Sequence, residues 1–101
     1  KEAARALVHA RLSVFNQHYQ LQVKKVFIRN QKTRWGSCSS RGNLNFNYRL
    51  AMLPLHLVDY VVVHELCHLG QFNHSPAFWA LVEKTLPNYK ALRAELKQQK
   101  M

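Results

Sequence analysis

The sequence predicts a single α+β domain over residues 1–101, in which one helix comes first, a small antiparallel sheet follows, and three helices complete the chain. Apolar residues recur at helical spacing in residues 3–19 and 54–69. Between them, the content of β-branched and aromatic residues rises from Val23 to Ile28, and the turn-forming string SSRGN follows at residues 39–43. A chain of 101 residues is long enough for one hydrophobic core but too short for two.

The first helix is expected over Ala3 to Tyr19, where no glycine or proline interrupts the apolar pattern. Two or three antiparallel strands are expected next, with a turn at residues 39–43. Pro54 suits the first turn of the second helix, because its missing N–H needs no partner there. An apolar stripe then runs down this helix through Leu57, Val58, Val61, Val62 and Leu69.

The string HSP at residues 74–76 predicts a third helix, with Ser75 as N-cap and Pro76 at the first helical position. This helix is expected to end near residue 86, because a proline follows it. Residues 89–98 then predict a short terminal helix. Phe78 and Trp79 are expected to wedge the third helix against the second.

The second helix ends in the string HELCHLGQFNH, which contains three of the six histidines in the chain. His64 and His68 are four residues apart, so on a helix they share one face and can bind one ion through nitrogens at ~2.0–2.1 Å. Glu65 lies beside this pair and can reach a water on the metal without being a ligand. Because zinc lowers the pKa of a bound water to ~7, this pattern predicts a zinc hydrolase with Glu65 as general base.

A catalytic zinc needs a third protein ligand and one open position. His74 can reach the ion only if the helix stops after His68, because six more helical residues would carry it ~9 Å along the axis. Gly70 and Asn73 are predicted to make the turn, since both tolerate the left-handed conformation. Glu83 on the next helix is the rival ligand. We favour His74 as the third ligand, because the presence of Gly70 and Asn73 is explained only if the turn that leads to His74 matters.

The two cysteines are too few for a secreted disulfide scaffold. Cys67 faces away from the metal-binding face by helical angle and is expected to be a small core residue. A single bridge between Cys38 and Cys67 stays open, although reduced thiols are favoured.

The formal net charge is +10, and it is unevenly distributed. Between Lys24 and Arg49 the chain has seven cations and no acid. Such a surface attracts polyanions such as nucleic acid, with Lys24, Lys25, Arg29 and Lys32 as candidate contacts. A solvated basic face without a ligand is an equally weighted interpretation.

Apolar runs are far shorter than the ~18 residues that a membrane span needs, and no secretory leader is recognisable. We therefore expect a cytoplasmic monomer without membrane contact. The first residue is Lys1 rather than methionine, which favours the C-terminal part of a longer chain.

Two strings, RWGSCSSRGNLNFNYRL and LVDYVVVHELCHLGQFNHSPAFW, resemble the YgjP-like zinc metallopeptidase domain, a zincin-like family related in motif to the SprT-like and Wss-like proteases. The resemblance implies a zincin-like fold, one zinc ion held by His64, His68 and His74, and Glu65 as general base. It also implies a substrate cleft beside the metal, on a strand that an extended peptide can pair with. The cleft residues that it implies are Arg34, Trp35, Gly36 and Ser37.

The predicted function is hydrolysis of peptide bonds in a protein or peptide substrate by a zinc-activated water. Two alternatives stay open. In the first, the chain is a metal-dependent nucleotide or phosphoanhydride hydrolase. The same zinc-bound water attacks phosphorus, and the cations between Lys24 and Arg49 hold the phosphates. In the second, a nucleic-acid-binding module carries a structural zinc. Glu65 counts against this second alternative, because a closed zinc site has no use for a neighbouring carboxylate.

Overall fold

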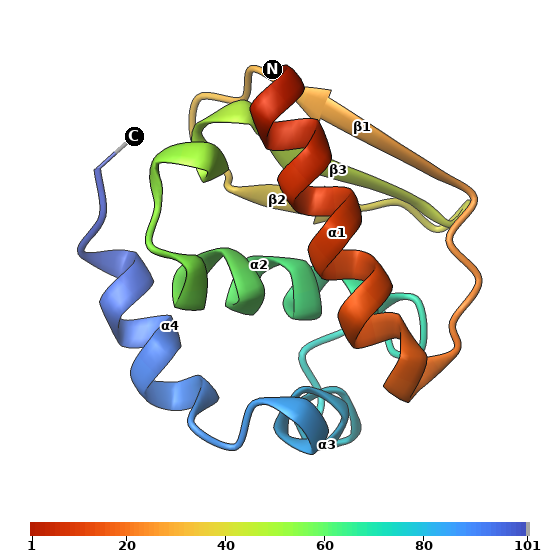
Figure 1. The fold of residues 1–101 in the computed structure, drawn as a ribbon. Helices are drawn as coiled ribbons and strands as arrows, with labels where there is room; N and C mark the ends of the chain where they lie inside the picture. Colours follow the sequence, from red (N-terminus) through yellow and green to blue (C-terminus); the bar gives the residue numbers. More distant parts are fainter. Residues whose placement is uncertain (101) are drawn as a thin grey trace.

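The computed structural model describes residues 1–100 and confirms the α+β class (Figure 1). The element order is the predicted one, with a short 3-10 helix added after the sheet. The elements are α1 (Glu2–Tyr19), β1 (Lys25–Arg29), β2 (Gly36–Cys38), β3 (Asn43–Asn47), η1 (Tyr48–Met52), α2 (Leu55–His68), α3 (Pro76–Thr85) and α4 (Tyr89–Lys97).

The helix ends follow local capping rules. The Ser75 side chain accepts a hydrogen bond from the backbone N–H of Phe78, and Pro76 occupies the first turn of α3, as predicted. Pro54 lies one position earlier than predicted, since it is the N-cap of α2. Its carbonyl accepts the first hydrogen bonds of that helix, so the proline still marks the start of α2.

The sheet is mixed, and the prediction of a wholly antiparallel sheet is wrong. The strand order is β1-β3-β2. β2 pairs with β3 antiparallel through the predicted turn, where Gly42 has a positive φ of 89°. β1 pairs with β3 in parallel, because the chain from residues 30 to 35 passes to the far edge of the sheet before β2 begins. A turn string indicates a hairpin, but it does not specify this crossover.

Asn47 holds the crossover segment in place. Its side-chain amide, fully buried, donates to the carbonyl of Gln31 at 2.8 Å and to that of Arg34 at 3.0 Å. The backbone N–H of Asn47 donates to the carbonyl of Trp35 at 2.9 Å. The buried amide therefore fixes the path of the chain just before β2, the strand that lies nearest to α2.

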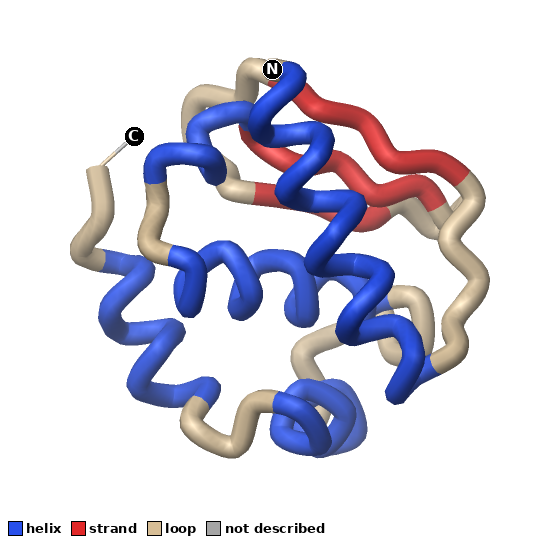
Figure 2. The backbone as a smooth tube through the Cα atoms, viewed as in Figure 1, coloured by secondary structure: helices blue, strands red, loops and turns tan. Residues whose placement is uncertain are grey.

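The core lies between the sheet and the two long helices. Figure 2 shows the strands gathered on one side of the molecule, with α1 crossing α2 beside them. The sheet contributes the buried side chains of Ile28, Leu44 and Phe46 to this core, and α2 contributes those of Val58 and Val62. An ion pair between Arg11 and Asp59 (Nε–Oδ1 2.7 Å) ties α1 to α2. None of the helices described is long and apolar enough to cross a membrane.

Candidate metal centre

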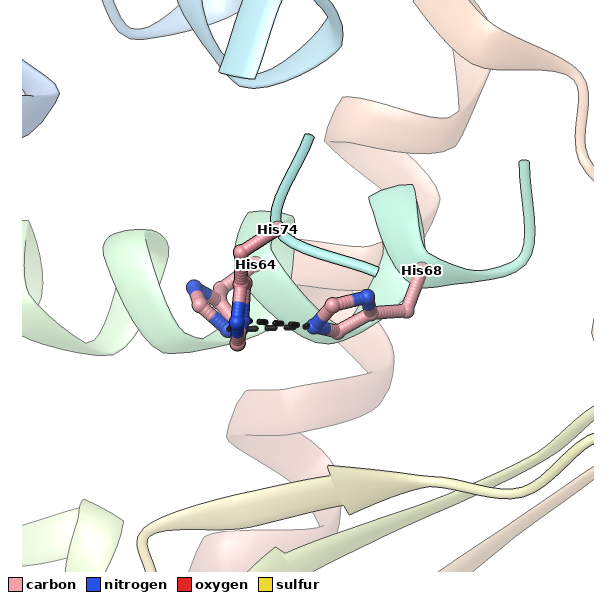
Figure 3. Close-up of side chains that lie close together, drawn as sticks. All are labelled: His64, His68 and His74. Carbon is pink, nitrogen blue, oxygen red and sulfur yellow. Dashed lines mark hydrogen bonds between the residues drawn. The ribbon is translucent and has the colours of Figure 1, made fainter. Parts of the chain in front are cut away.

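Three histidine side chains converge at the end of α2. His64 and His68 come from the last two turns of that helix, and His74 comes from the loop that follows (Figure 3). Each of the three Nε2 atoms lies 3.2 Å from the other two. We call these residues the histidine triad. They are the one group of three or more potential ligands close enough to hold an ion within residues 1–100.

The triad fits a tetrahedral metal ion. With metal–nitrogen bonds of ~2.0–2.1 Å, nitrogen separations of this size correspond to ligand–metal–ligand angles of roughly 100°, close to the tetrahedral value. Three mutually adjacent Nε2 atoms cannot all be satisfied by hydrogen bonds to one another, because a neutral imidazole carries one proton on its two nitrogens. Three such nitrogens close together form a group that could hold a metal ion.

Neighbouring groups set the tautomers that metal binding needs. The Nδ1–H of His68 donates to the carbonyl of Gln71 at 3.0 Å, which leaves the Nε2 lone pair free. Nδ1 of His64 lies 3.4 Å from the Tyr60 hydroxyl oxygen, and either group can be the donor in this pair. Burial, reinforced by the adjacent imidazoles, lowers the pKa of His64 to about 3, and burial also lowers that of His68. Both rings are therefore neutral, as metal ligands must be.

Aromatic side chains of α3 hold the rings. Phe78 is fully buried and stacks on His68 at 4.3 Å between ring centroids, with 18° between the planes. Trp79 lies nearly parallel to His74 at 5.8 Å and stacks on Tyr89 of α4. The prediction that Phe78 and Trp79 wedge α3 against α2 is confirmed. Their contacts with the triad add a role in positioning its rings that the sequence did not reveal.

The turn that brings His74 back does not use the predicted backbone conformation. Within residues 1–100, positive φ occurs only at Gln20 and Gly42, so the expectation for Gly70 and Asn73 is wrong. Gly70 instead lies close to Leu81 of α3. A Cβ there would lie 3.1 Å from Cδ1 of Leu81, so the missing side chain lets α3 approach the end of α2.

The structure distinguishes the two candidates for the third metal ligand. His74 lies in the triad, whereas Glu83 is exposed on α3 and is not among the groups that can hold an ion together. Cys67 is fully buried, as expected for a core residue, and both cysteines are free.

Glu65 lies beside the triad and is largely buried. Its side chain is 7% exposed. Burial raises the pKa of its carboxyl to about 8, and the charge of Arg34 offsets part of this rise. Gly36 of β2 makes room for it, since a Cβ at that position would lie 3.0 Å from Cγ of Glu65. The missing side chain therefore lets the strand approach the carboxylate closely.

Two cavities flank the triad. One, of about 290 Å³, extends toward the loop before His74 and is lined by Ser37, Cys38 and Phe72 together with the triad and Glu65. The other, of about 270 Å³, lies toward α4 and is lined by Trp35, Tyr60 and Val61 together with His64 and Glu65. Arg34 and Gly36 line both. All four cleft residues that the resemblance implied therefore lie beside the triad.

The basic residues singled out for polyanion binding lie elsewhere. Lys24, Lys25, Arg29 and Lys32 are exposed, on β1 and the segments that flank it. None of them lines either cavity beside the triad. If these side chains bind a ligand, they do so outside the cleft.

Sequence reasoning missed several cavity residues. Tyr60 is four residues before His64 on the same helix, so helical spacing alone places it on the metal-binding face. Arg93, Leu96 and Lys97 reach the site from α4. No local signal in the sequence links that helix to the triad, because its position depends on how α3 and α4 pack.

Comparisons with known proteins identify related folds and a family. A crystal structure of the metallopeptidase zymogen abylysin of Pyrococcus abyssi has 28% sequence identity and a TM-score of 0.79, over 92% of this chain and 96% of that one. The zymogen jannalysin of Methanocaldococcus jannaschii has 18% identity and a TM-score of 0.69, over 94% of each chain, and supports the fold alone. A search of curated proteins returns no significant match. Residues 1–99 match the YgjP-like metallopeptidase domain, and the chain therefore belongs to this family of metal-dependent peptidases.

Proposed function

We propose that the chain is a zinc peptidase in which the histidine triad holds one zinc ion and Glu65 is the general base. The observation that carries this proposal is the convergence of three imidazole Nε2 atoms beside a buried carboxylate at an open cleft. Three histidines leave a fourth tetrahedral position for water or substrate. The zincin-like pattern that the sequence resembles has the same three parts.

The bound zinc would supply a water of lowered pKa and would polarise the scissile carbonyl. Glu65 would take a proton from the attacking water and deliver it to the leaving amine nitrogen. Burial raises the pKa of this carboxyl in the metal-free chain, and the positive charge of a bound zinc would lower it again, which would leave a carboxylate able to accept the proton.

The substrate would bind as an extended strand. β2 is at the edge of the sheet and pairs only with β3 among the described strands, so its other side has free backbone groups. An extended peptide can add to such an edge through main-chain hydrogen bonds. Arg34, Trp35, Gly36 and Ser37 would then lie along the bound peptide, and Gly36 would let it pass close to Glu65.

Peptide hydrolysis is favoured over the phosphoanhydride alternative by the family match and by the placement of the cations. Of the seven between Lys24 and Arg49, only Arg34 lines the cavities beside the triad. A purely structural zinc is disfavoured, because Glu65 and two cavities lie next to the triad.

One assay tests the proposal against both alternatives. The purified chain is loaded with zinc and incubated with unstructured peptides and, separately, with nucleotides; the products are identified by mass spectrometry. We expect peptide cleavage that is lost after chelation and restored by zinc, with nucleotides left intact. Zinc-dependent release of phosphate without peptide cleavage would overturn the proposal in favour of the phosphoanhydride reaction.

A second candidate function is polyanion binding outside the cleft. No acid interrupts residues 3–58, and the four exposed cations on and around β1 come from this stretch. We expect binding to single- or double-stranded DNA whose log affinity falls with log salt, by ~0.7 to 0.9 for each phosphate neutralised. Replacing Lys24, Lys25, Arg29 and Lys32 by glutamine should reduce this slope. The absence of binding at low salt, or an affinity unchanged in the variant, would contradict the idea.

A further inference from the structure

The cavity between β2, α2 and α4 has an apolar floor next to the reacting groups. Trp35, Tyr60, Val61 and Leu96 form this floor, and His64 and Glu65 lie at its edge. Its volume of about 270 Å³ is sufficient for a large amino-acid side chain. A peptide that lies along β2 over Glu65 would place a side chain next to its scissile bond into this space.

Three cations surround the same cavity. They are Arg34 before β2 and Arg93 and Lys97 on α4, and Glu65 is the single acid of the lining. The cations therefore outnumber the carboxylate even when Glu65 is ionised. Arg93 also lies over the ring of Trp79, with its guanidinium carbon 5.4 Å from the ring centroid.

Within residues 1–100, none of these three cations forms an ion pair with an acidic side chain. The chain has five acids, and two of them are already paired: Asp59 with Arg11 and Glu95 with His56. Glu65 belongs to the site, and the other two, Glu2 and Glu83, are exposed and form no ion pair in the described structure. Even Glu95, on the same helix as Arg93 and Lys97, is held by His56 with 2.8 Å between Nε2 and Oε2. The cleft therefore has excess positive charge for a ligand to neutralise.

We propose that this cavity selects substrates in which a bulky apolar residue next to the scissile bond is accompanied by a carboxylate. The apolar side chain would fill the floor, and the carboxylate would pair with Arg93 and Lys97 at the mouth. This inference rests on the proposed peptidase function and names its substrate class. The carboxylate comes either from an acidic residue that follows the apolar one or from the free C-terminus of the peptide.

Matched peptides separate these two sources. The first set is acetyl-Ala-Ala-Leu-Z-amide with Asp, Asn or Lys at position Z, and the second is acetyl-Ala-Ala-Leu as free acid and as amide. We expect kcat/KM to be about 5- to 10-fold higher for the acidic member of one set, since pairs at exposed cations are individually weak. The preference should diminish as salt is raised. Equal rates in both sets, or a preference for lysine, would overturn the inference.

Variants on α4 locate the effect. In the double variant Arg93→Gln/Lys97→Gln, the ratio of kcat/KM for the carboxylate peptide to that for its neutral partner should fall to about 2-fold or less, whatever the rate on the neutral peptide becomes. Lys90→Gln removes the same charge from an exposed position of α4 that does not line the cavity, so it should keep the preference. A preference that persists in the double variant would contradict the assignment to these two residues.

A binding measurement distinguishes this inference from the proposed chemistry. The zinc-loaded Glu65→Gln variant is titrated with fluorescently labelled forms of the same peptides, and affinity is read by polarisation. Tighter binding of the carboxylate peptides supports the inference. If the wild-type chain nevertheless cleaves no peptide, only the peptidase proposal fails. Equal affinities in a chain that does cleave peptides would overturn the inference and leave the peptidase proposal intact.

Discussion

Replacing Glu65 by glutamine is expected to leave zinc bound and to lower the rate of peptide hydrolysis by about 10² to 10⁴-fold. Glutamine keeps the size of the side chain, so the close approach of Gly36 is undisturbed. It cannot take a proton from water, so the general base is lost while the three imidazole ligands remain. Single-turnover kinetics on a peptide that the wild-type chain cleaves measure the rate of hydrolysis, and metal analysis of the same sample measures the zinc content.

A matched control excludes a general effect of changing a charge that lines the cavities beside the triad. Arg34→Gln changes the electrostatic environment of Glu65 but leaves its carboxylate in place, so its loss of rate should be much smaller than that of Glu65→Gln. Full hydrolytic activity in zinc-loaded Glu65→Gln would show that another group takes the proton, even with every ligand assigned correctly.

The features that sequence reasoning predicted well are those that short-range geometry dictates. The spacing of His64 and His68 fixes their shared helical face, and the Ser75 and Pro76 pair marks the start of α3, whatever the rest of the chain does. The same holds for the turn between β2 and β3. Each of these features depends on a few neighbouring residues, so a local pattern is enough to predict it.

The features that it missed depend on contacts between distant segments. The parallel pairing of β1 with β3 depends on a crossover that the buried Asn47 amide holds, and nothing beside Asn47 in the sequence announces that role. Gly70 does not have the predicted left-handed conformation, and it lies close to Leu81, eleven residues later, a contact that its sequence neighbours do not indicate. The cations of α4 reach the cleft only after α3 and α4 have packed. These interactions exist only in the folded chain.

Replacing His64, His68 or His74 by alanine is expected to reduce both zinc content and peptidase activity, because each change removes one of the three proposed protein ligands of the zinc ion. Glu83→Ala is the matched control, since this residue is the rival ligand and is exposed on α3. It should keep near-normal zinc occupancy. Metal analysis of the four variants after dialysis against the same zinc buffer provides the comparison. A His74→Ala variant that keeps its zinc, beside a Glu83→Ala variant that loses it, would assign the third ligand to the glutamate.

The same ligands should make stability depend on zinc, because the ion would join the last turns of α2 to the loop that carries His74. At free zinc of about 100 times Kd, binding to the native state contributes ~2.7 kcal/mol, and its removal should lower the Tm of a domain of this size by roughly 10 °C or more. Adding zinc to the chelated wild-type chain should restore the Tm. His74→Ala should show little response, because its site is incomplete, whereas Glu83→Ala should respond as the wild type does. A zinc-loaded wild-type sample whose Tm does not move on chelation would contradict a site that connects α2 to the His74 loop.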